Sequence, residues 1–260
     1  MRVKFNNLFL QKKIFFKDTK KIFIDSLKNS KFIGGKEIIN FEKKFSKILG
    51  SNYCVSVANG TDALIIALKC LDINYGDEVI TSAHTWVSTA GAIIAVGAKP
   101  VFVDTDRFFS IDADKIERKI SKKTKAIIPV HLYGQSCDMH KIIRIAKKHN
   151  LRVIEDCAQA HLSKYHDKFL GNFGDIGTFS FFPAKNLGSI GDAGAIICNK
   201  KKIYELVKRY KNHGSIKKNI HETFGINSRM DNIHAAFLNK KIKYLKKFNF
   251  KRNKIDKIYY

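Results

Sequence analysis

The stretch Tyr53-Cys54-Val55-Ser56-Val57-Ala58-Asn59-Gly60-Thr61-Asp62-Ala63-Leu64 decides the fold class. Residues 53–57 have the apolar, β-branched character of a short buried strand. Asn59-Gly60 is a turn signal, and residues 62–71 follow it with an apolar helix pattern. A strand that turns at once into a helix is typical of an α/β protein.

The same alternation continues along the chain. Strand patterns occupy residues 78–81, 101–103, 126–130 and 151–155, and helix patterns occupy residues 87–96, 113–120 and 140–149. Strands that are separated by crossover helices pair in parallel. The sequence therefore predicts a layered α/β fold with a mostly parallel central sheet.

The segment before this alternation contains a predicted helix at residues 36–49. Ile38, Phe41, Phe45 and Ile48 recur there at intervals of three and four residues, and Gly50 ends the pattern. This is the first well-formed helix that the sequence indicates.

After Gly171 the pattern changes to closely spaced strands. Residues 177–182 and 193–199 read as strands on either side of the glycine loop 188–194, and a helix begins near Lys202. Residues 240–260 form a lysine-rich helical pattern. We find no internal repeat and no flexible linker.

Composition indicates an ordinary globular protein. The chain has 260 residues, of which 45% are hydrophobic, enough for one large core or two modest ones. Its five cysteines are scattered without a Cys-x-x-Cys pair, which argues against a zinc site and a disulfide framework. No signal-peptide pattern precedes them, so we expect a cytoplasmic protein. The apolar runs are far shorter than the ~20 residues of a membrane span.

The formal net charge of +25 raises the possibility of nucleic-acid binding. The lysines, however, are spread over nearly every segment, and the dense stretch 240–257 has the spacing of a solvated helix face. We therefore expect no nucleic-acid partner, although the positive field would attract an anionic substrate.

Lys185 and Asp156 are the strongest candidates for chemistry. Lys185 lies in Phe181-Phe182-Pro183-Ala184-Lys185-Asn186-Leu187-Gly188, between an apolar strand and a glycine loop, and Asp156 ends the strand pattern of residues 151–155. An aldehyde cofactor needs an amine that forms a Schiff base and a carboxylate on its ring nitrogen. The pair predicts a pyridoxal 5'-phosphate site.

Four other positions could complete such a site, and three of them also have a plainer explanation. Gly60 opens a helix whose free N–H groups suit a phosphate, but a simple capped turn explains it equally well. Trp86 follows a strand and could stack on a ring, or it could be a core aromatic. Gln159 lies three residues after Asp156 and could reach the phenolic oxygen of the cofactor. Ser180 could bind phosphate or be an ordinary strand serine.

These segments together resemble the DegT/DnrJ/EryC1 family of nucleotide-sugar aminotransferases, from about Phe32 to the C-terminus. The motifs that carry the resemblance are, in chain order, NGTDAL (59–64), GDEVIT (76–81), IPVHLYGQ (128–135), IED (154–156), GDIG (174–177), SFFP (180–183), KNLG (185–188) and GDAGA (191–195). The resemblance implies a three-layer fold-type I transferase large domain that binds pyridoxal phosphate and works as a homodimer with shared active sites.

The resemblance also assigns roles to individual residues. It implies that Lys185 forms the Schiff base, that Asp156 holds the pyridinium and that Trp86 and Gln159 contact the ring. The phosphate would be held by Thr61, Asp62 and Ser180, and Asn227 would reach the phosphate site of the neighbouring subunit.

The implied reaction is a transamination. Glutamate would donate the amino group, and the keto group of a nucleotide-linked deoxysugar would accept it, for amino-sugar, lipopolysaccharide or other surface polysaccharide biosynthesis. Lys185 favours transamination over the dehydration of relatives that have histidine there. The sugar, the aminated carbon and the base stay open.

The resemblance implies three regions: an N-terminal segment and helix (1–50), a cofactor-binding large domain (51–239) and the start of an incomplete C-terminal small domain (240–260). Family members generally continue beyond this point. A second hypothesis is therefore a truncated, catalytically impaired member that still folds and binds cofactor, and a third is a basic nucleic-acid-binding protein.

Overall fold

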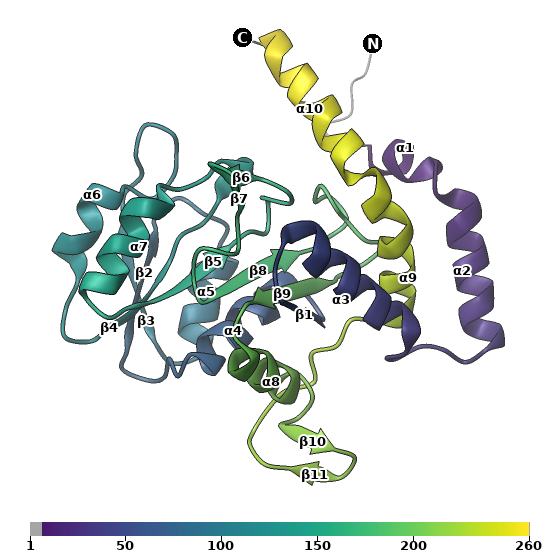
Figure 1. The fold of residues 1–260 in the computed structure, drawn as a ribbon, viewed down its shortest axis with the longest axis horizontal. Helices are drawn as coiled ribbons and strands as arrows, with labels where there is room; N and C mark the ends of the chain where they lie inside the picture. The colour runs from purple at the N-terminus through teal and green to yellow at the C-terminus, as the bar shows by residue number, and fades with distance from the viewer. Residues whose placement is uncertain (1–6, 260) are drawn as a thin grey trace.

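A seven-stranded mixed sheet forms the centre of the protein (Figure 1). The computed structural model describes residues 7–259, without the side chains of residues 9–11. The strand order is β1-β9-β8-β5-β4-β2-β3. The strands are β1 (Tyr53–Val57), β2 (Glu78–Ser82), β3 (Lys99–Val103), β4 (Thr124–Ile128), β5 (Arg152–Asp156), β8 (Ile176–Ser180) and β9 (Gly194–Cys198).

Strand direction places the ends of several strands at one edge of the sheet. β2, β3, β4, β5 and β8 pair in parallel, whereas β9 runs antiparallel to both β8 and β1. β1 therefore points the same way as β8, and Gly194 pairs with both Val57 and Ser180. The carboxyl ends of β1, β2, β5 and β8 thus share one edge.

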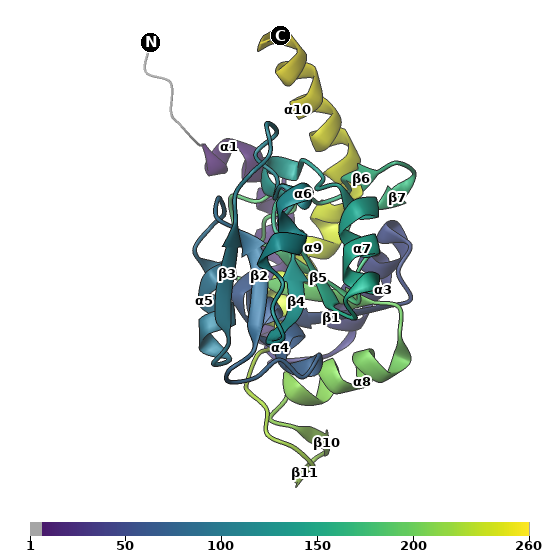
Figure 2. The same ribbon diagram turned by 90° about the vertical axis from the view of Figure 1, so that its left-hand side faces the viewer.

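Helices cover both faces of the sheet and make three layers (Figure 2). One core lies between the sheet and α3, α6, α7 and α9, and a second core lies between the sheet and α4, α5 and α8. The bounds of these helices are α3 (Lys36–Leu49), α4 (Gly60–Cys70), α5 (Ser88–Ala95), α6 (Ala113–Ile116), α7 (Met139–Lys148), α8 (Lys201–Tyr210) and α9 (Asn232–Lys241). The α/β fold with a mostly parallel sheet, predicted from the sequence, is confirmed.

The predicted helix at residues 36–49 is α3. Ile38, Phe41 and Phe45 are buried against the sheet, and Gly50 adopts the left-handed φ of 68° that ends the helix. Residues 113–120 differ from the prediction, because α6 ends at Ile116 and a 3-10 turn follows (η1, Glu117–Lys119).

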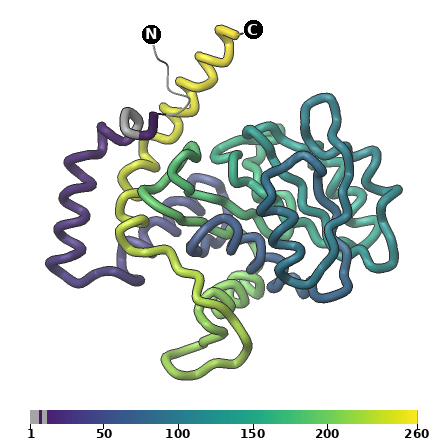
Figure 3. The backbone as a smooth tube through the Cα atoms, turned by 180° about the vertical axis from the view of Figure 1, so that it is seen from behind, coloured from purple at the N-terminus to yellow at the C-terminus, as the bar shows by residue number. Residues whose placement is uncertain are grey.

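Two helices before α3 correct the expectation that the first well-formed helix begins at Lys36. They are α1 (Leu8–Lys13) and α2 (Phe16–Lys28), and α2 lies beside α9 (Figure 3). The only buried side chain of α2 is Ser26, while Phe16, Phe23 and Leu27 are exposed. The apolar residues of α2 therefore form no buried stripe in the described part of the chain.

The remaining elements are short, except for the last helix. They are η2 (Leu132–Gly134), η3 (Ile242–Tyr244), α10 (Leu245–Tyr259) and the hairpins β6–β7 (Lys164–Tyr165, Lys168–Phe169) and β10–β11 (Ser215–Lys217, Ile220–His221). η3 and α10 lie within the predicted helical stretch 240–260, whose residue 260 is outside the described residues. Among the helices described, none combines the length and apolar character that crossing a membrane requires.

Candidate active site

Most of the predicted site residues lie at the edge of the sheet where β1, β2, β5 and β8 end. Asp156 and Ser180 are the last residues of β5 and β8, and Gly60 is the first residue of α4, directly after β1. Trp86 lies in the loop between β2 and α5, and Lys185 lies in the loop between β8 and β9. Parallel topology alone therefore gathers residues that are far apart in sequence.

Lys185 is held in a tight turn at the start of the glycine loop. Its backbone N–H donates to the Phe182 carbonyl at 2.8 Å, and its own carbonyl accepts from the Gly188 N–H at 2.8 Å. Burial lowers the pKa of the Lys185 amine, and the nearby Asp156 charge acts in the opposite direction. A lysine with a lowered pKa spends more time as the free, nucleophilic amine.

Asp156 is buried, with its carboxylate held at both oxygens. Oδ2 accepts a hydrogen bond from the Thr89 hydroxyl at 2.9 Å, and Oδ1 accepts one from the Ala158 N–H at 3.1 Å. Burial raises the pKa of this carboxyl, whereas the Ala158 N–H, the Thr89 hydroxyl and the Lys185 charge favour the ionised form. The two donors leave lone pairs on the carboxylate for a further partner.

The start of α4 offers unpaired backbone donors. Asn59 caps the helix, since its side-chain oxygen accepts from the Asp62 N–H at 2.8 Å. The amides of Gly60 and Thr61 are at helix positions that have no acceptor within the helix. A Cβ atom at Gly60 would come within 2.7 Å of Ser180 Cβ, and one at Gly194 would collide with the Asn59 carbonyl. The glycines thus let three chain segments close around this helix end.

Hydroxyl groups surround the same helix end. Thr61 donates to the Ser88 hydroxyl at 3.0 Å, and Ser180 Oγ accepts from the Phe182 N–H at 3.3 Å. Amides at a helix N-terminus together with hydroxyls form a site that suits a phosphate group. Ser88 was not predicted from the sequence, and its position at the start of α5, two residues after Trp86, is the signal that could have found it.

Trp86 and Gln159 also reach this edge. The Trp86 side chain is 70% exposed, which is incompatible with the core-aromatic alternative. Gln159 Oε1 accepts the Tyr133 N–H at 2.7 Å and steadies Tyr133, whose φ of 56° is unusual for a residue other than glycine. With its oxygen engaged, the amide of Gln159 has its N–H donors available for another acceptor.

Asn227 is the predicted site residue that the structure leaves apart. It is exposed and forms an isolated bridge with Asn212, at the end of α8. Within residues 7–259, no hydrogen bond joins its side chain to the other predicted site residues. Its neighbour Ser228, however, accepts from the Ala58 N–H at 3.1 Å, which ties this segment to the end of β1.

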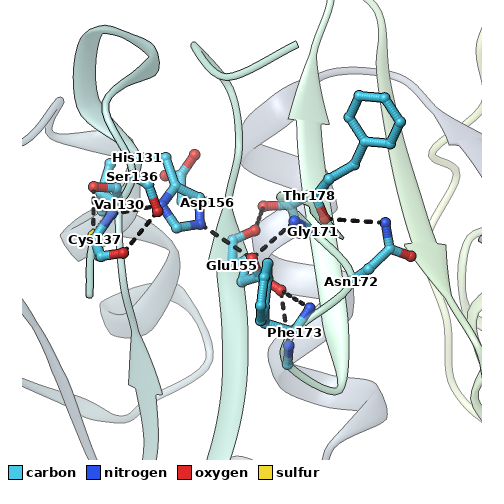
Figure 4. A network of polar contacts seen from close by, with 12 residues as sticks. Val130, His131, Ser136, Cys137, Glu155, Asp156, Gly171, Asn172, Phe173 and Thr178 are labelled. Carbon is cyan, nitrogen blue, oxygen red and sulfur yellow. Dashed lines mark hydrogen bonds and ion pairs between the residues drawn. The ribbon is translucent and has the colours of Figure 1, made fainter. Parts of the chain in front are cut away.

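A buried network under the site was missed by the sequence analysis (Figure 4). Glu155 accepts from the N–H groups of Gly171, Phe173 and Gly174 at 2.6–2.8 Å and contacts His131 Nε2 at 3.1 Å. The Cys137 N–H donates to His131 Nδ1, so the proton of the ring is on Nε2 and points at Glu155. This network fixes β5, and with it Asp156, against the loop after β7.

The same network contains atoms of types that bind metals. His131, Glu155 and Cys157 are all buried, and their ligand atoms lie within 4.8 Å of one another. Both Glu155 oxygens already accept backbone hydrogen bonds. The group is therefore accounted for as a hydrogen-bond network.

Two other lysines donate hydrogen bonds to the loop that contains Lys185. Lys241 is fully buried and donates to the Gly188 carbonyl at 2.7 Å, and Lys12 donates to the Ser189 carbonyl at 2.6 Å. Burial, with the charges of Lys12 and Arg252 nearby, lowers the pKa of Lys241 to about 7. A buried lysine without a carboxylate partner is unusual, and no sequence pattern indicated it.

The donor set fits pyridoxal phosphate. The cofactor has an aldehyde, a basic ring nitrogen and a phosphate. The site has a partly buried amine at Lys185, a buried carboxylate at Asp156 and a helix N-terminus ringed by hydroxyls. The exposed face of Trp86 adds a surface for an aromatic ring.

Comparison with known proteins gives the same picture. Residues 15–260 match the DegT/DnrJ/EryC1/StrS aminotransferase family. The chain is 48% identical over 234 residues to the dTDP-3-amino-3,6-dideoxy-alpha-D-galactopyranose transaminase of Aneurinibacillus thermoaerophilus, covering 90% of this chain and 64% of that protein. It is 44% identical over 224 residues to the UDP-N-acetyl-3-dehydro-alpha-D-glucosamine 3-aminotransferase of Acidithiobacillus ferrooxidans, covering 86% and 61%.

Solved structures agree in fold. DesV of S. venezuelae superposes with a TM-score of 0.91 at 36% identity, over 95% of this chain and 67% of that one. NtdA of Bacillus subtilis, solved with bound cofactor PMP, gives 0.84 at 39% identity, over 88% and 53%. The chain spans 61–64% of the length of the two curated relatives above. Sequence, fold and site agree, and the chain belongs to the DegT/DnrJ/EryC1/StrS aminotransferase family.

Proposed function

We propose that this protein is a pyridoxal-phosphate-dependent aminotransferase that transfers an amino group from glutamate to a keto group of a nucleotide-linked deoxysugar. The observation that carries the proposal is that the charge of the buried Asp156 carboxylate acts on the partly buried Lys185 amine, at the edge of the sheet where α4 begins. Relatives named as transaminases of dTDP- and UDP-linked sugars support the substrate class. GDP-perosamine synthase of Escherichia coli is a further relative, at 42% identity.

When bound, pyridoxal phosphate supplies an aldehyde that captures amines and a ring that withdraws electrons. In our proposal Asp156 keeps the ring nitrogen protonated. Gly60, Thr61 and Asp62 at the start of α4, with Ser180, hold the phosphate. Trp86 stacks on the ring and Gln159 contacts its oxygen. These assignments are supported by the positions of the residues at one edge of the sheet.

Lys185 carries the proton transfer in this proposal. With the cofactor bound, the Lys185 amine, whose pKa is lowered by burial, would accept a proton from the carbon of the donor and return it elsewhere. The turn that holds Lys185 between Phe182 and Gly188 limits how far the amine travels. An amine that is already held near the atoms that lose and gain the proton removes the entropy cost of bringing in a base from solution.

The wider context is part of the same proposal. We place the cofactor-binding unit at residues 51–239, and we propose a homodimer in which Asn227 contacts the phosphate of the neighbouring subunit. The product is an amino sugar for a surface polysaccharide. We infer a cytoplasmic reaction, supported by five free cysteines.

A reconstitution experiment tests the proposal. Purified protein is mixed with pyridoxal phosphate, and we expect visible absorbance that shifts when glutamate is added. Keto-sugar nucleotides carrying dTDP, UDP or GDP are then supplied, and amino-sugar formation is measured by mass spectrometry. A spectrum that glutamate changes, with ordinary α-keto acids accepted and keto sugars refused, would overturn the sugar assignment. A spectrum that glutamate leaves unchanged would favour the impaired-member hypothesis.

A further inference from the structure

A chain of hydroxyl groups runs from the Trp86 loop to Asp156. Thr89, in the first turn of α5, is 1% exposed, and its hydroxyl donates to Asp156 Oδ2 at 2.9 Å. The Thr85 hydroxyl lies 3.2 Å from the Thr89 hydroxyl. Thr85 is the residue immediately before Trp86. The series of hydroxyl groups therefore links Trp86 and Asp156, two of the residues predicted to contact the cofactor ring.

The direction of these hydrogen bonds follows from counting protons. A threonine hydroxyl has one proton, and Thr89 gives it to the carboxylate. The bond between the two threonines therefore has Thr85 as donor and Thr89 as acceptor. Each bond in such a chain polarises the next, which strengthens the bond that reaches the charge.

The carboxylate depends on few partners. Besides Thr89, its oxygens accept from the Ala158 N–H, and a hydrogen bond from the peptide backbone cannot be removed by changing a side chain. The charged or titratable groups around it are Lys185 from the glycine loop, His131 from the segment after β4, and Glu155 and Cys157 beside it in sequence. Among the described residues, Thr89 is thus the one whose side chain donates a hydrogen bond to the Asp156 carboxylate.

We propose that Thr89 is a positioning residue for Asp156, and that Thr85 extends this control to the loop of Trp86. Thr89 keeps the carboxylate ionised and fixes the rotation that aims its free lone pairs at a cofactor nitrogen. The role rests on the proposed function of Asp156. The series of hydroxyl hydrogen bonds exists in the protein without cofactor, so it can be measured in cofactor-free protein.

The first test uses cofactor-free protein labelled with 13C at the aspartate carboxyls. Asp156 is assigned by the signal that disappears in Asp156→Asn, and its titration is followed by NMR. We expect Thr89→Val to raise the pKa of Asp156, because a donor to the charged form is lost. Thr89→Ser should restore the parent titration, and Thr85→Val should shift it in the same direction as Thr89→Val but less.

Thr81→Val is the matched control. Thr81 is also a buried threonine, and its hydroxyl donates to the Ile128 carbonyl at 2.9 Å rather than to Asp156. It should leave the titration of Asp156 unchanged. An unchanged titration in Thr89→Val, or a serine variant that behaves like valine, would overturn the proposal. If Thr89→Val does not fold, the Thr85→Val variant decides the proposal. An unchanged titration of Asp156 in Thr85→Val would show that the hydroxyl groups do not act on the carboxylate.

The second test uses protein reconstituted with pyridoxal phosphate. We expect Thr89→Val to slow the half-reaction with glutamate by about tenfold, a barrier change of ~1.4 kcal/mol, and to alter its pH profile. Thr89→Ser should recover both. If Lys185 cannot be trapped with the cofactor, the proposed function fails, whereas the NMR titration still decides the hydroxyl chain.

Discussion

Gly60 and Ser180 approach so closely that a Cβ atom on Gly60 would lie 2.7 Å from the Ser180 Cβ. Gly60 begins α4 after β1, and Ser180 ends β8, so the contact joins two strands that have β9 between them. The contact brings a serine hydroxyl next to free amides at the helix start. Glycine is required here by space, since its φ is not positive.

Gly60→Ala should therefore loosen this corner. We expect it to lower the free energy of unfolding by about 1–3 kcal/mol, as is usual for overpacking, and to weaken pyridoxal phosphate binding more than that of pyridoxal. Gly91→Ala is the matched control, because Gly91 lies in α5 with open space around it. It should stabilise the protein by about 0.5–1 kcal/mol. Urea unfolding measures the free energy of unfolding, and fluorescence titration measures cofactor binding. Equal changes of these quantities in the two variants would contradict the steric argument.

Lys185→Ala should abolish the covalent link to the cofactor. An imine conjugated with the ring is reduced by borohydride to a stable amine, so peptide mapping of the treated protein identifies the attached lysine. Lys122→Ala, at an exposed lysine in the loop before β4, should keep the label. Label on another lysine of the parent protein would remove Lys185 from the site.

Asp156→Asn should slow the half-reaction with glutamate at least about a hundredfold, on the order of 3 kcal/mol in the barrier. The amide cannot hold the ring nitrogen in its protonated form, which is the form that withdraws electrons. Cofactor affinity should fall less, because the phosphate contacts are untouched. Rapid-mixing absorbance gives the rate, and parent-like kinetics would exclude the carboxylate from the chemistry.

The same substitution should change how stability depends on pH. Burial raises the pKa of Asp156 in the folded chain above its unfolded value of about 3.9. Between these two values the folded state binds more protons, so this group makes the free energy of unfolding fall as pH rises, and its full cost remains above the folded pKa. Asp156→Asn removes that cost.

Asp156→Asn should accordingly gain stability relative to the parent as pH rises across this window. Urea unfolding of the cofactor-free proteins in steps from pH 4.5 to pH 8 provides the measurement. A difference between the two proteins that stays constant with pH would show that burial does not penalise the charge.

Glu155→Gln should destabilise the fold by roughly 2–4 kcal/mol. The side-chain amide has one oxygen instead of two, and its N–H donors would face either the Gly171 amide with the ring N–H of His131 or the amides of Phe173 and Gly174. Glu205→Gln on the outside of α8 is the control and should change stability by less than about 0.5 kcal/mol. Similar losses in both variants would refute a special role of the buried network.

Sequence patterns predicted the parts of the molecule that depend on local chemistry. α3 was found with its bounds because a buried apolar stripe and a terminal glycine are both visible in the sequence. α2 was not predicted, although Phe16, Phe23 and Leu27 recur in it at intervals of seven and four residues. A helical pattern in the sequence does not by itself bury its apolar residues, since these three are exposed.

The candidate site shows the same division. Lys185 and Asp156 could be predicted because each lies in a recognisable setting, a glycine loop and a strand end. Thr89 could not, since nothing local connects it to a carboxylate on another strand. Lys241 could not either, because a lysine in a helix is normally assigned to solvent, and its burial depends on a carbonyl in a distant loop.

The antiparallel strand β9 has a consequence for how the protein is made. Within residues 7–259, β1 lies at the edge of the sheet and pairs only with β9, which is synthesised after every other strand of that sheet. While the ribosome is still producing β2 to β8, β1 has no partner, and an unpaired apolar strand is open to wrong association. Gly194 also packs on Asn59 at the start of α4. A nascent chain therefore cannot assemble the close contacts of Asn59, Gly60 and Ser180 until β9 has left the exit tunnel.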